Sequence, residues 1–214
     1  MKLLVVGANG GVGRHIVNQA LSDKHEVTAF VRRSDGLDLS HPNLKVVIGN
    51  ILEDQHKLQD AMRGHDAVIS ALGNGLVVKG NGGKILNRAM SSVVQAMKVN
   101  HIKRLSLLMA YGAGESLSYA NIFIKFLGYT FFRKDFADLG AAEKVVVESN
   151  LEWTIAYFGA LTDEPDKNKY VPSSSLKTPS KLRISRSSVA DFLLTSVTDR
   201  KFIKQRAVLS GRNG

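Results

Sequence analysis

The chain has 214 residues, of which 44% are hydrophobic and 22% are charged, and its formal net charge is +10. This size and composition suit one folded domain with a substantial core and argue against disorder. There is no cysteine, which excludes disulfides, zinc–thiolate sites, iron–sulfur clusters and a cysteine nucleophile.

The distribution of charged and apolar residues narrows the class of protein further. Lys and Arg are spread along the chain in runs of no more than two, so we favour a basic surface that attracts an anionic ligand over nucleic-acid binding. The apolar run at residues 3–6 is too short for a secretory signal, and the run at 120–132 is too short for a membrane span and contains Lys125. We therefore expect a soluble, cytoplasmic protein without a metal site.

The first fourteen residues predict a strand, a glycine turn and a helix. Residues 3–6 form a continuous apolar run, as in a strand buried on both faces, and Gly7, Gly10 and Gly13 follow at three-residue spacing. Apolar residues then recur with a helical period at Val12, Ile16, Val17, Ala20 and Leu21. This is the context in which a glycine motif indicates dinucleotide binding, whereas a glycine-rich turn without a ligand is the alternative.

Each glycine of the turn has a distinct expected role. Gly7 lets the chain leave the strand sharply, Gly10 leaves room for a pyrophosphate, and Gly13 lets the helix pack close to the strand. The free N–H groups and the positive end of the helix dipole then face the phosphates. The residues expected to contact the cofactor here are Gly7, Asn9, Gly10, Gly11, Val12 and Gly13.

The second predicted strand, residues 26–31, ends in Arg32 and Arg33. NAD-selective folds place an acidic residue about 20 positions after the glycine turn, where it binds the ribose hydroxyls. Arg32 lies nineteen residues beyond Gly13, and guanidinium groups pair with a 2′-phosphate instead. The sequence therefore predicts NADP(H) in preference to NAD(H), unless these arginines merely solvate a strand end.

The rest of the chain continues to alternate strands and helices. Strands are predicted at 44–48, 66–73, 104–109, 152–157 and 207–209, and helices at 53–62, 85–97, 135–149 and from 185 onward. We expect Asn50 and Ile51 to border the adenine, and Ala71, Leu72 and Gly73 to approach the cofactor. A glycine-rich segment at 74–83 is predicted to be a mobile loop, and polar residues 163–179 a surface excursion.

These elements predict a single NAD(P)-binding Rossmann domain over residues 1–214, built as one doubly wound parallel sheet. Residues 111–134 and 158–185 are expected to form a small substrate-side portion. Aromatic residues within 115–134 could close over a substrate, mediate a dimer contact or pack on the core as a helix. Tyr111 and Phe158 each follow a strand end beside the expected nicotinamide site, and we predict that they stack on the substrate.

The order of these motifs resembles the NmrA-like, atypical short-chain dehydrogenase/reductase family, and within it the small NAD(P)H-dependent flavin and biliverdin reductases. The resemblance covers nearly the whole chain. Its motifs are Gly7 to Gly13, Val31-Arg32-Arg33, Gly49 to Leu52 (where the family usually has Gly-Asp), Ser70 to Gly73, Glu148 to Ile155 and Ile184 to Phe192. It implies one Rossmann domain that binds NAD(P)(H), with the substrate over the nicotinamide.

The chain departs from this superfamily in the residues that polarise a carbonyl. Ordinary members use Ser, Tyr and Lys, but the usual serine position holds Met109-Ala110-Tyr111, and no Tyr-x-x-x-Lys occurs. Counting back from Ser149, the Tyr and Lys positions fall near Asp135 and Leu139. Reduction of a ketone through a tyrosine acid is therefore disfavoured.

Three functions remain in view, and we favour the first. It is an NADPH-dependent oxidoreductase that transfers hydride to a flavin, a quinone or a similar planar acceptor. The second is a non-catalytic sensor that reports the NADP(H) state to a protein partner. The third, a nucleotide-sugar epimerase or dehydratase, needs the missing tyrosine and a larger substrate domain.

Overall fold

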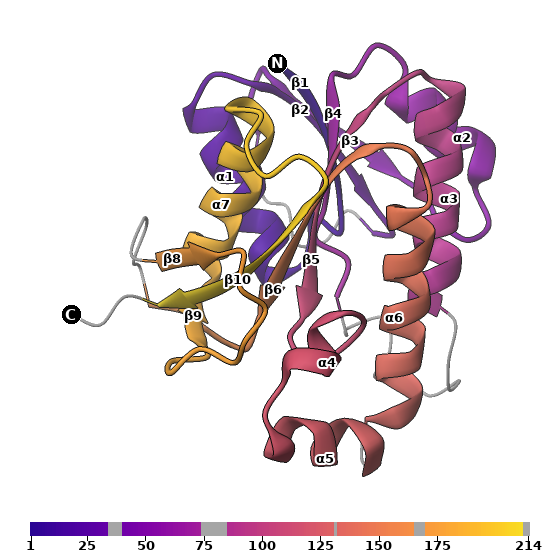
Figure 1. Ribbon diagram of the computed structural model, residues 1–214. Coiled ribbons are helices and arrows are strands. Elements are labelled where there is room, and N and C mark those ends of the chain that lie inside the picture. The colour runs from indigo at the N-terminus through magenta and orange to yellow at the C-terminus, as the bar shows by residue number, and fades with distance from the viewer. Residues whose placement is uncertain (34–39, 74–84, 131, 165–169, 212–214) are drawn as a thin grey trace.

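The computed structural model describes residues 1–33, 40–73, 85–130, 132–164 and 170–211 (Figure 1). Segment 74–83, which we predicted to be a mobile loop, lies outside the described residues. The described chain is an α/β fold in which helices cover both faces of a central sheet. The prediction of a doubly wound parallel sheet with a Rossmann-like α/β fold is confirmed, although one edge pair of strands is antiparallel.

The main sheet has eight strands in the order β3-β2-β1-β4-β5-β6-β10-β8. The strands are β1 (Lys2–Val6), β2 (Glu26–Val31), β3 (Leu44–Ile48), β4 (Ala67–Ser70), β5 (Arg104–Ala110), β6 (Glu152–Phe158), β8 (Tyr170–Ser173) and β10 (Gln205–Gly211). All neighbouring pairs are parallel except β10 and β8. The strand order reverses beside β1, and ligands of such sheets bind at this switch point, outside the carboxyl ends of the strands.

Strand β8 corrects the prediction that residues 163–179 are only a surface excursion. It pairs antiparallel with β10, so that Pro172 lies opposite Leu209. Proline cannot donate a ladder hydrogen bond and is therefore confined to edge positions, which β8 occupies. A strand of only four residues that contains a proline carries little sequence signal for β structure.

Two helical layers complete the core. On one face, α1 (Gly11–Ser22) packs against α7 (Arg186–Thr198); on the other, α3 (Ile85–Val99) packs against α2 (Gln55–Met62) and α6 (Arg133–Val147). Each layer encloses its own cluster of buried apolar side chains against the sheet. Among the helices that the structure describes, none is long and apolar enough to cross a membrane.

Two smaller features lie beyond the carboxyl ends of the strands. Helices α4 (Ser116–Tyr119) and α5 (Ile122–Thr130) connect β5 to α6 at the lower end of the molecule in Figure 1. Strands β7 (Ala160–Thr162) and β9 (Arg183–Ser185) form a separate parallel pair. These features belong to the two segments that we assigned to the substrate side.

The two substrate-side segments are joined by hydrogen bonds. The Tyr111 hydroxyl donates to the Leu176 carbonyl at 2.8 Å, and the Asn121 amide donates to the Thr178 hydroxyl at 2.9 Å. Most aromatic side chains of α4 and α5 are nevertheless exposed. The expectation of a helix simply packed on the core therefore does not describe them.

Candidate cofactor site

The turn between β1 and α1 has a geometry that requires glycine at two positions. Gly7 has a φ of +77°, and a Cβ on it would lie 2.8 Å from the backbone of Ala71. A Cβ on Gly13 would lie 2.2 Å from the Gly7 carbonyl oxygen, so the first turn of α1 packs directly on the turn. The Gly10 amide donates to the same carbonyl at 3.0 Å, which closes the turn.

The start of α1 is suited to hold an anion. The first amides of a helix have no acceptor within the helix, and they carry a partial positive charge. No side chain caps α1, and its first turn has no acidic residue. Gly10, Gly11 and Val12 all line a cavity at this point, so the helix start faces an open volume.

This cavity has a volume of about 540 Å³, which is in the range of cofactor and small-molecule sites. Of the residues that we predicted to bind cofactor or substrate, most line it: Gly7, Asn9, Gly10, Gly11, Val12, Arg32, Arg33, Ile51, Ala71, Leu72, Gly73 and Phe158. The structure brings in further lining residues that we did not predict: Val6, Phe30, Val31, Gly49, Leu108, Leu161 and Arg186.

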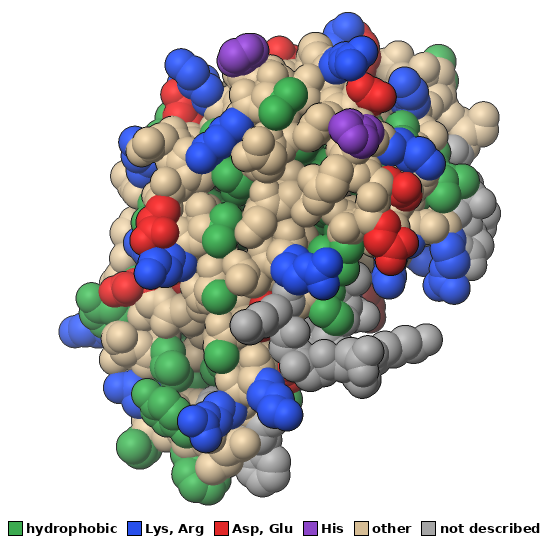
Figure 2. Space-filling model, turned by 90° about the vertical axis from the view of Figure 1, so that its right-hand side faces the viewer, with side chains coloured by type: hydrophobic (Ala, Val, Ile, Leu, Met, Phe, Trp, Pro, Cys, Tyr) green, Lys and Arg blue, Asp and Glu red, His purple; other side chains and the backbone are tan. Residues whose placement is uncertain are grey.

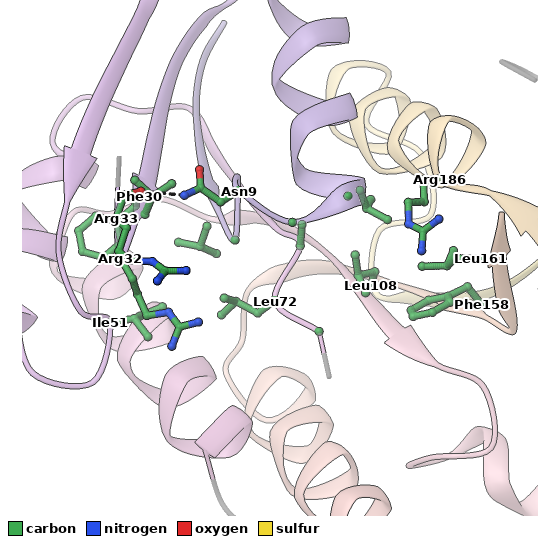
Figure 3. Close-up of a pocket in the computed structure, with 18 of the residues that line it drawn as sticks. Asn9, Phe30, Arg32, Arg33, Ile51, Leu72, Leu108, Phe158, Leu161 and Arg186 are labelled. Carbon is green, nitrogen blue, oxygen red and sulfur yellow. Dashed lines mark hydrogen bonds between the residues drawn. The ribbon is translucent and has the colours of Figure 1, made fainter. Parts of the chain in front are cut away.

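One end of the cavity is cationic. Arg32 and Arg33 follow β2 and are both exposed beside the glycine turn (Figure 3). The Asn9 side-chain amide donates to the Arg33 carbonyl at 2.7 Å, which ties the glycine turn to the end of β2. The two segments that carry the phosphate-binding prediction are therefore held together.

Three predicted site residues are not among the lining residues. Gly13 lies behind the turn, where it permits close packing. Asn50 stabilises the turn before α2: its amide donates to Asp54 at 2.7 Å, and its Oδ1 accepts from the Leu52 amide at 3.1 Å. Tyr111 is buried, and its hydroxyl donates to the Leu176 carbonyl. The structure thus brings Phe158, and not Tyr111, to the described lining.

The opposite end of the cavity is largely apolar. Leu108, Phe158 and Leu161 approach it from β5, β6 and β7 (Figure 3). Arg186, the first residue of α7, projects toward the same end and contacts Gly11, since a Cβ on that glycine would lie 2.6 Å from the Arg186 Cδ. Its guanidinium pairs with Asp163 at 2.6 Å, which offsets its charge.

The described lining contains no Asp, Glu, His, Lys, Ser, Thr or Tyr. Tyr157 precedes the lining residue Phe158 in β6, but its side chain is fully buried away from the cavity, and its hydroxyl donates to Glu143 at 2.8 Å. Burial, reinforced by the Glu143 carboxylate, raises the pKa of Tyr157 far above its ordinary value. Within the described part of the chain, the cavity therefore has no side chain suited to general acid catalysis at neutral pH. Among the same described residues, no group of three or more His, Asp or Glu side chains could hold a metal ion.

The fold and this cavity define an NAD(P)-binding α/β protein. Residues 7–200 match the family model described as NAD(P)H-binding. The chain therefore belongs to the NAD(P)H-binding family, and the prediction of a nicotinamide dinucleotide cofactor is confirmed.

Individual relatives agree with this family. The chain is 30% identical over 204 residues to the uncharacterized chloroplastic protein At2g34460 of Arabidopsis thaliana, covering 89% of this chain and 69% of that protein. The fold is similar to that of a Veillonella parvula short-chain dehydrogenase/reductase solved with NADP (TM-score 0.79, 18% identity, 98% and 94% coverage). It is also similar to ChuY of Escherichia coli O157:H7, described as an anaerobilin reductase (TM-score 0.81, 21% identity, 100% and 98% coverage).

Proposed function

We propose that this protein is an NADPH-dependent oxidoreductase that transfers hydride to a planar, conjugated acceptor such as a flavin or a quinone. The observation that carries the proposal is the lining of the cavity, which joins a glycine turn suited to phosphate to an apolar end where the described residues include no proton donor. Such an acceptor delocalises the incoming electrons in its own rings and can take its proton from water. A ketone or an aldehyde would need a positioned acid.

Different lining residues would bind the cofactor and the acceptor along the cavity. The amides at the start of α1 hold the pyrophosphate, and Arg32 and Arg33 pair with the 2′-phosphate. Ile51 and the backbone at Ala71 shape the wall between the two ends. When bound, the nicotinamide supplies the hydride, and Phe158 with Leu161 holds the acceptor against it and excludes water.

The similarity to ChuY supports a reductase as the reaction class, because that protein is described as one. The second candidate is a non-catalytic NADP(H) sensor. The absence of an acid from the described lining favours it equally, because a sensor needs the cofactor turn but no catalytic group. An epimerase or dehydratase is not supported, because no tyrosine is among the lining residues that the structure describes.

The test is turnover with purified protein and NADPH in the presence of FMN, riboflavin, a quinone or biliverdin, followed at the nicotinamide absorbance band. We expect acceptor-dependent loss of NADPH, faster than loss of NADH at equal concentration. Tight NADPH binding by calorimetry with no turnover on any acceptor would favour the sensor. Absence of heat with either nucleotide would overturn both proposals.

A further inference from the structure

A cluster of large apolar side chains projects into solvent from α4, α5 and the start of α6. We call it the α5 surface, and its residues are Tyr119, Ile122, Phe123, Phe126, Tyr129 and Phe132. Ile122 is 84% exposed, Phe123 66% and Tyr129 64%. Monomeric soluble proteins rarely expose contiguous apolar patches of this kind unless a partner or a membrane covers them.

The arrangement of these residues on α5 is amphipathic. Ile122, Phe126 and Tyr129 recur at i, i+4 and i+7 and so form one stripe along the helix. Ile124 instead packs against the core, where it contacts the position of Gly112. The helix is therefore anchored to the protein by one side and presents aromatic rings on the other.

The charge around the α5 surface is mostly positive. Residues 115–135 contain Lys125, Arg133 and Lys134, with Glu115 and Asp135 at the two ends of this segment. The exposed Lys177 lies next to this surface in space, because the neighbouring Thr178 accepts a hydrogen bond from Asn121. Figure 2 shows hydrophobic side chains gathered at the lower end of the molecule, where α5 lies in Figure 1, with Lys and Arg side chains beside them.

We propose that the α5 surface docks on an anionic lipid bilayer. Helices that lie in the membrane interface combine exposed aromatic or aliphatic residues with Lys and Arg, which attract anionic headgroups. The α5 surface has both features, and the net charge of +10 adds a long-range attraction toward such a surface.

A second copy of this chain fits the surface less well. A twofold interface is self-complementary, so two α5 surfaces would bring Lys125, Arg133 and Lys134 toward the same residues of the other copy. The carboxylates that flank this segment, Glu115 and Asp135, are fewer than these cations. The excess of like charge would oppose association, whereas anionic headgroups would neutralise it.

The α5 surface lies at the same end of the molecule as the cofactor cavity. The α5 surface and the cofactor cavity both lie beyond the carboxyl ends of the parallel strands, since Gly7 and Leu72 follow β1 and β4 and the α4–α5 segment follows β5. Docking would therefore turn the end of the molecule that holds the cavity toward the bilayer.

The test is flotation of the full-length protein with phosphatidylcholine vesicles that contain or lack phosphatidylglycerol. We expect binding to the anionic vesicles and loss of this binding at high salt. Phe123→Ser combined with Phe126→Ser should weaken it by at least about tenfold, and Lys134→Glu by at least about fivefold, because each cation near an anionic surface contributes on this scale. The matched control is Val99→Ser, which removes a side chain that is 51% exposed at the far end of α3 and should leave binding unchanged.

NADPH binding serves as the folding control for each variant, and it also separates this proposal from the oxidoreductase proposal, because vesicle binding requires no cofactor. Lack of flotation with either kind of vesicle at low salt would overturn the inference. So would flotation that the double phenylalanine variant leaves intact. If light scattering instead finds a concentration-dependent dimer that this variant dissociates, and vesicles are not bound, the surface is an interface between copies.

Discussion

Both ends of the cofactor cavity carry arginines, but these arginines differ in their exposure to solvent. Arg32 and Arg33 are exposed at the end of β2, where solvent and a phosphate can reach both. The Arg186 side chain is only 28% exposed, and its guanidinium is paired with Asp163. We expect the exposed Arg32 to recognise a charged group at one end, whereas Arg186 forms part of the cavity wall at the other end with its charge compensated by Asp163.

This difference matches the two tasks that we propose for the cavity. Recognition of a 2′-phosphate needs an accessible positive charge, which the exposed Arg32 offers. Binding of an uncharged conjugated ring needs apolar contact, which Leu108, Phe158 and Leu161 provide. We therefore propose that the cofactor end selects its ligand by charge and the acceptor end by shape.

The largest expected effect removes the turn on which both ends depend. Gly13→Ala would place a Cβ 2.2 Å from the Gly7 carbonyl, so α1 must shift and its amides lose their alignment with the cavity. We expect NADPH affinity to fall about a hundredfold or more and stability to fall by about 1–3 kcal/mol, measured by calorimetry and urea unfolding. Gly140→Ala in α6 is the control, because its Cβ would meet no atom closer than 3.5 Å. Unchanged NADPH binding in Gly13→Ala would contradict this account of the turn.

The next prediction tests the cationic end alone. Arg32→Asp should weaken NADPH binding about tenfold to a hundredfold, because a charge-assisted contact is replaced by repulsion, while NADH binding changes little. Titration of both nucleotides by fluorescence measures the ratio. Lys45→Asp makes the same change of charge at an exposed position within β3 and should leave the ratio unaltered. Equal losses for NADPH and NADH in Arg32→Asp would show that Arg32 does not read the 2′-phosphate.

The acceptor end can be altered without touching the turn. Phe158→Ala should raise the KM for a flavin or quinone about tenfold through the loss of a stacking surface, with the Kd for NADPH nearly unchanged. Steady-state kinetics alongside nucleotide titration separates the two constants. Tyr111→Phe is the comparison, because it removes only the hydroxyl that binds the Leu176 carbonyl. A larger effect on KM from Tyr111→Phe than from Phe158→Ala would reverse our assignment.

The pairing of Arg186 with Asp163 allows a test of whether charge compensation sets the difference between the two ends of the cavity. Asp163→Asn leaves the guanidinium without its carboxylate partner and so makes the acceptor end resemble the cationic end. We expect kcat/KM for FMN to rise about fivefold relative to that for riboflavin, which lacks the phosphate. An unchanged ratio would show that Arg186 does not face the acceptor.

The cofactor end could be predicted from the sequence because its signals are local. The strand, the three glycines and the first turn of α1 lie within one short segment, and Arg32 follows at a spacing that the fold determines. Arg186 was missed as a lining residue because its contact with Gly11 joins opposite ends of the chain. The Ile184 to Phe192 motif contained it, but the motif alone does not show where α7 packs.

Two other differences between the sequence predictions and the structure also have specific causes. Tyr111 follows a strand end as expected, but its hydroxyl donates to the Leu176 carbonyl, and the side chain is not among the described lining residues. The exposed aromatics of α5 could not be told from core residues, because a helical repeat gives the same pattern whichever medium its apolar side faces. The packing of Ile124 against the core marks the inner side, and the exposure of Ile122, Phe126 and Tyr129 marks the outer one.

The smallest expected effect lies away from both ends of the cavity. His65 precedes β4, and its Nε2 lies 2.9 Å from the Thr28 hydroxyl. Partial burial lowers the pKa of His65 below its ordinary value of 6.5, so the folded state favours the neutral ring. The unfolded chain then binds more protons, and the stability that this neutral ring contributes is present above pH 6.5 and is lost as the pH falls through the folded pKa.

His65→Gln should therefore reduce the decline in unfolding free energy below pH 6.5, measured by urea unfolding across this range. His25 has a pKa lowered in the same direction, also chiefly by burial, so part of the decline should persist in the variant. His56→Gln is the control, because that side chain is exposed on α2. Because the described cavity lining has no histidine or carboxylate, the His65 variant should leave NADPH affinity unchanged at every pH. A matching change in affinity would mean that His65 is coupled to the cavity, and the separation of stability from cofactor binding would be wrong.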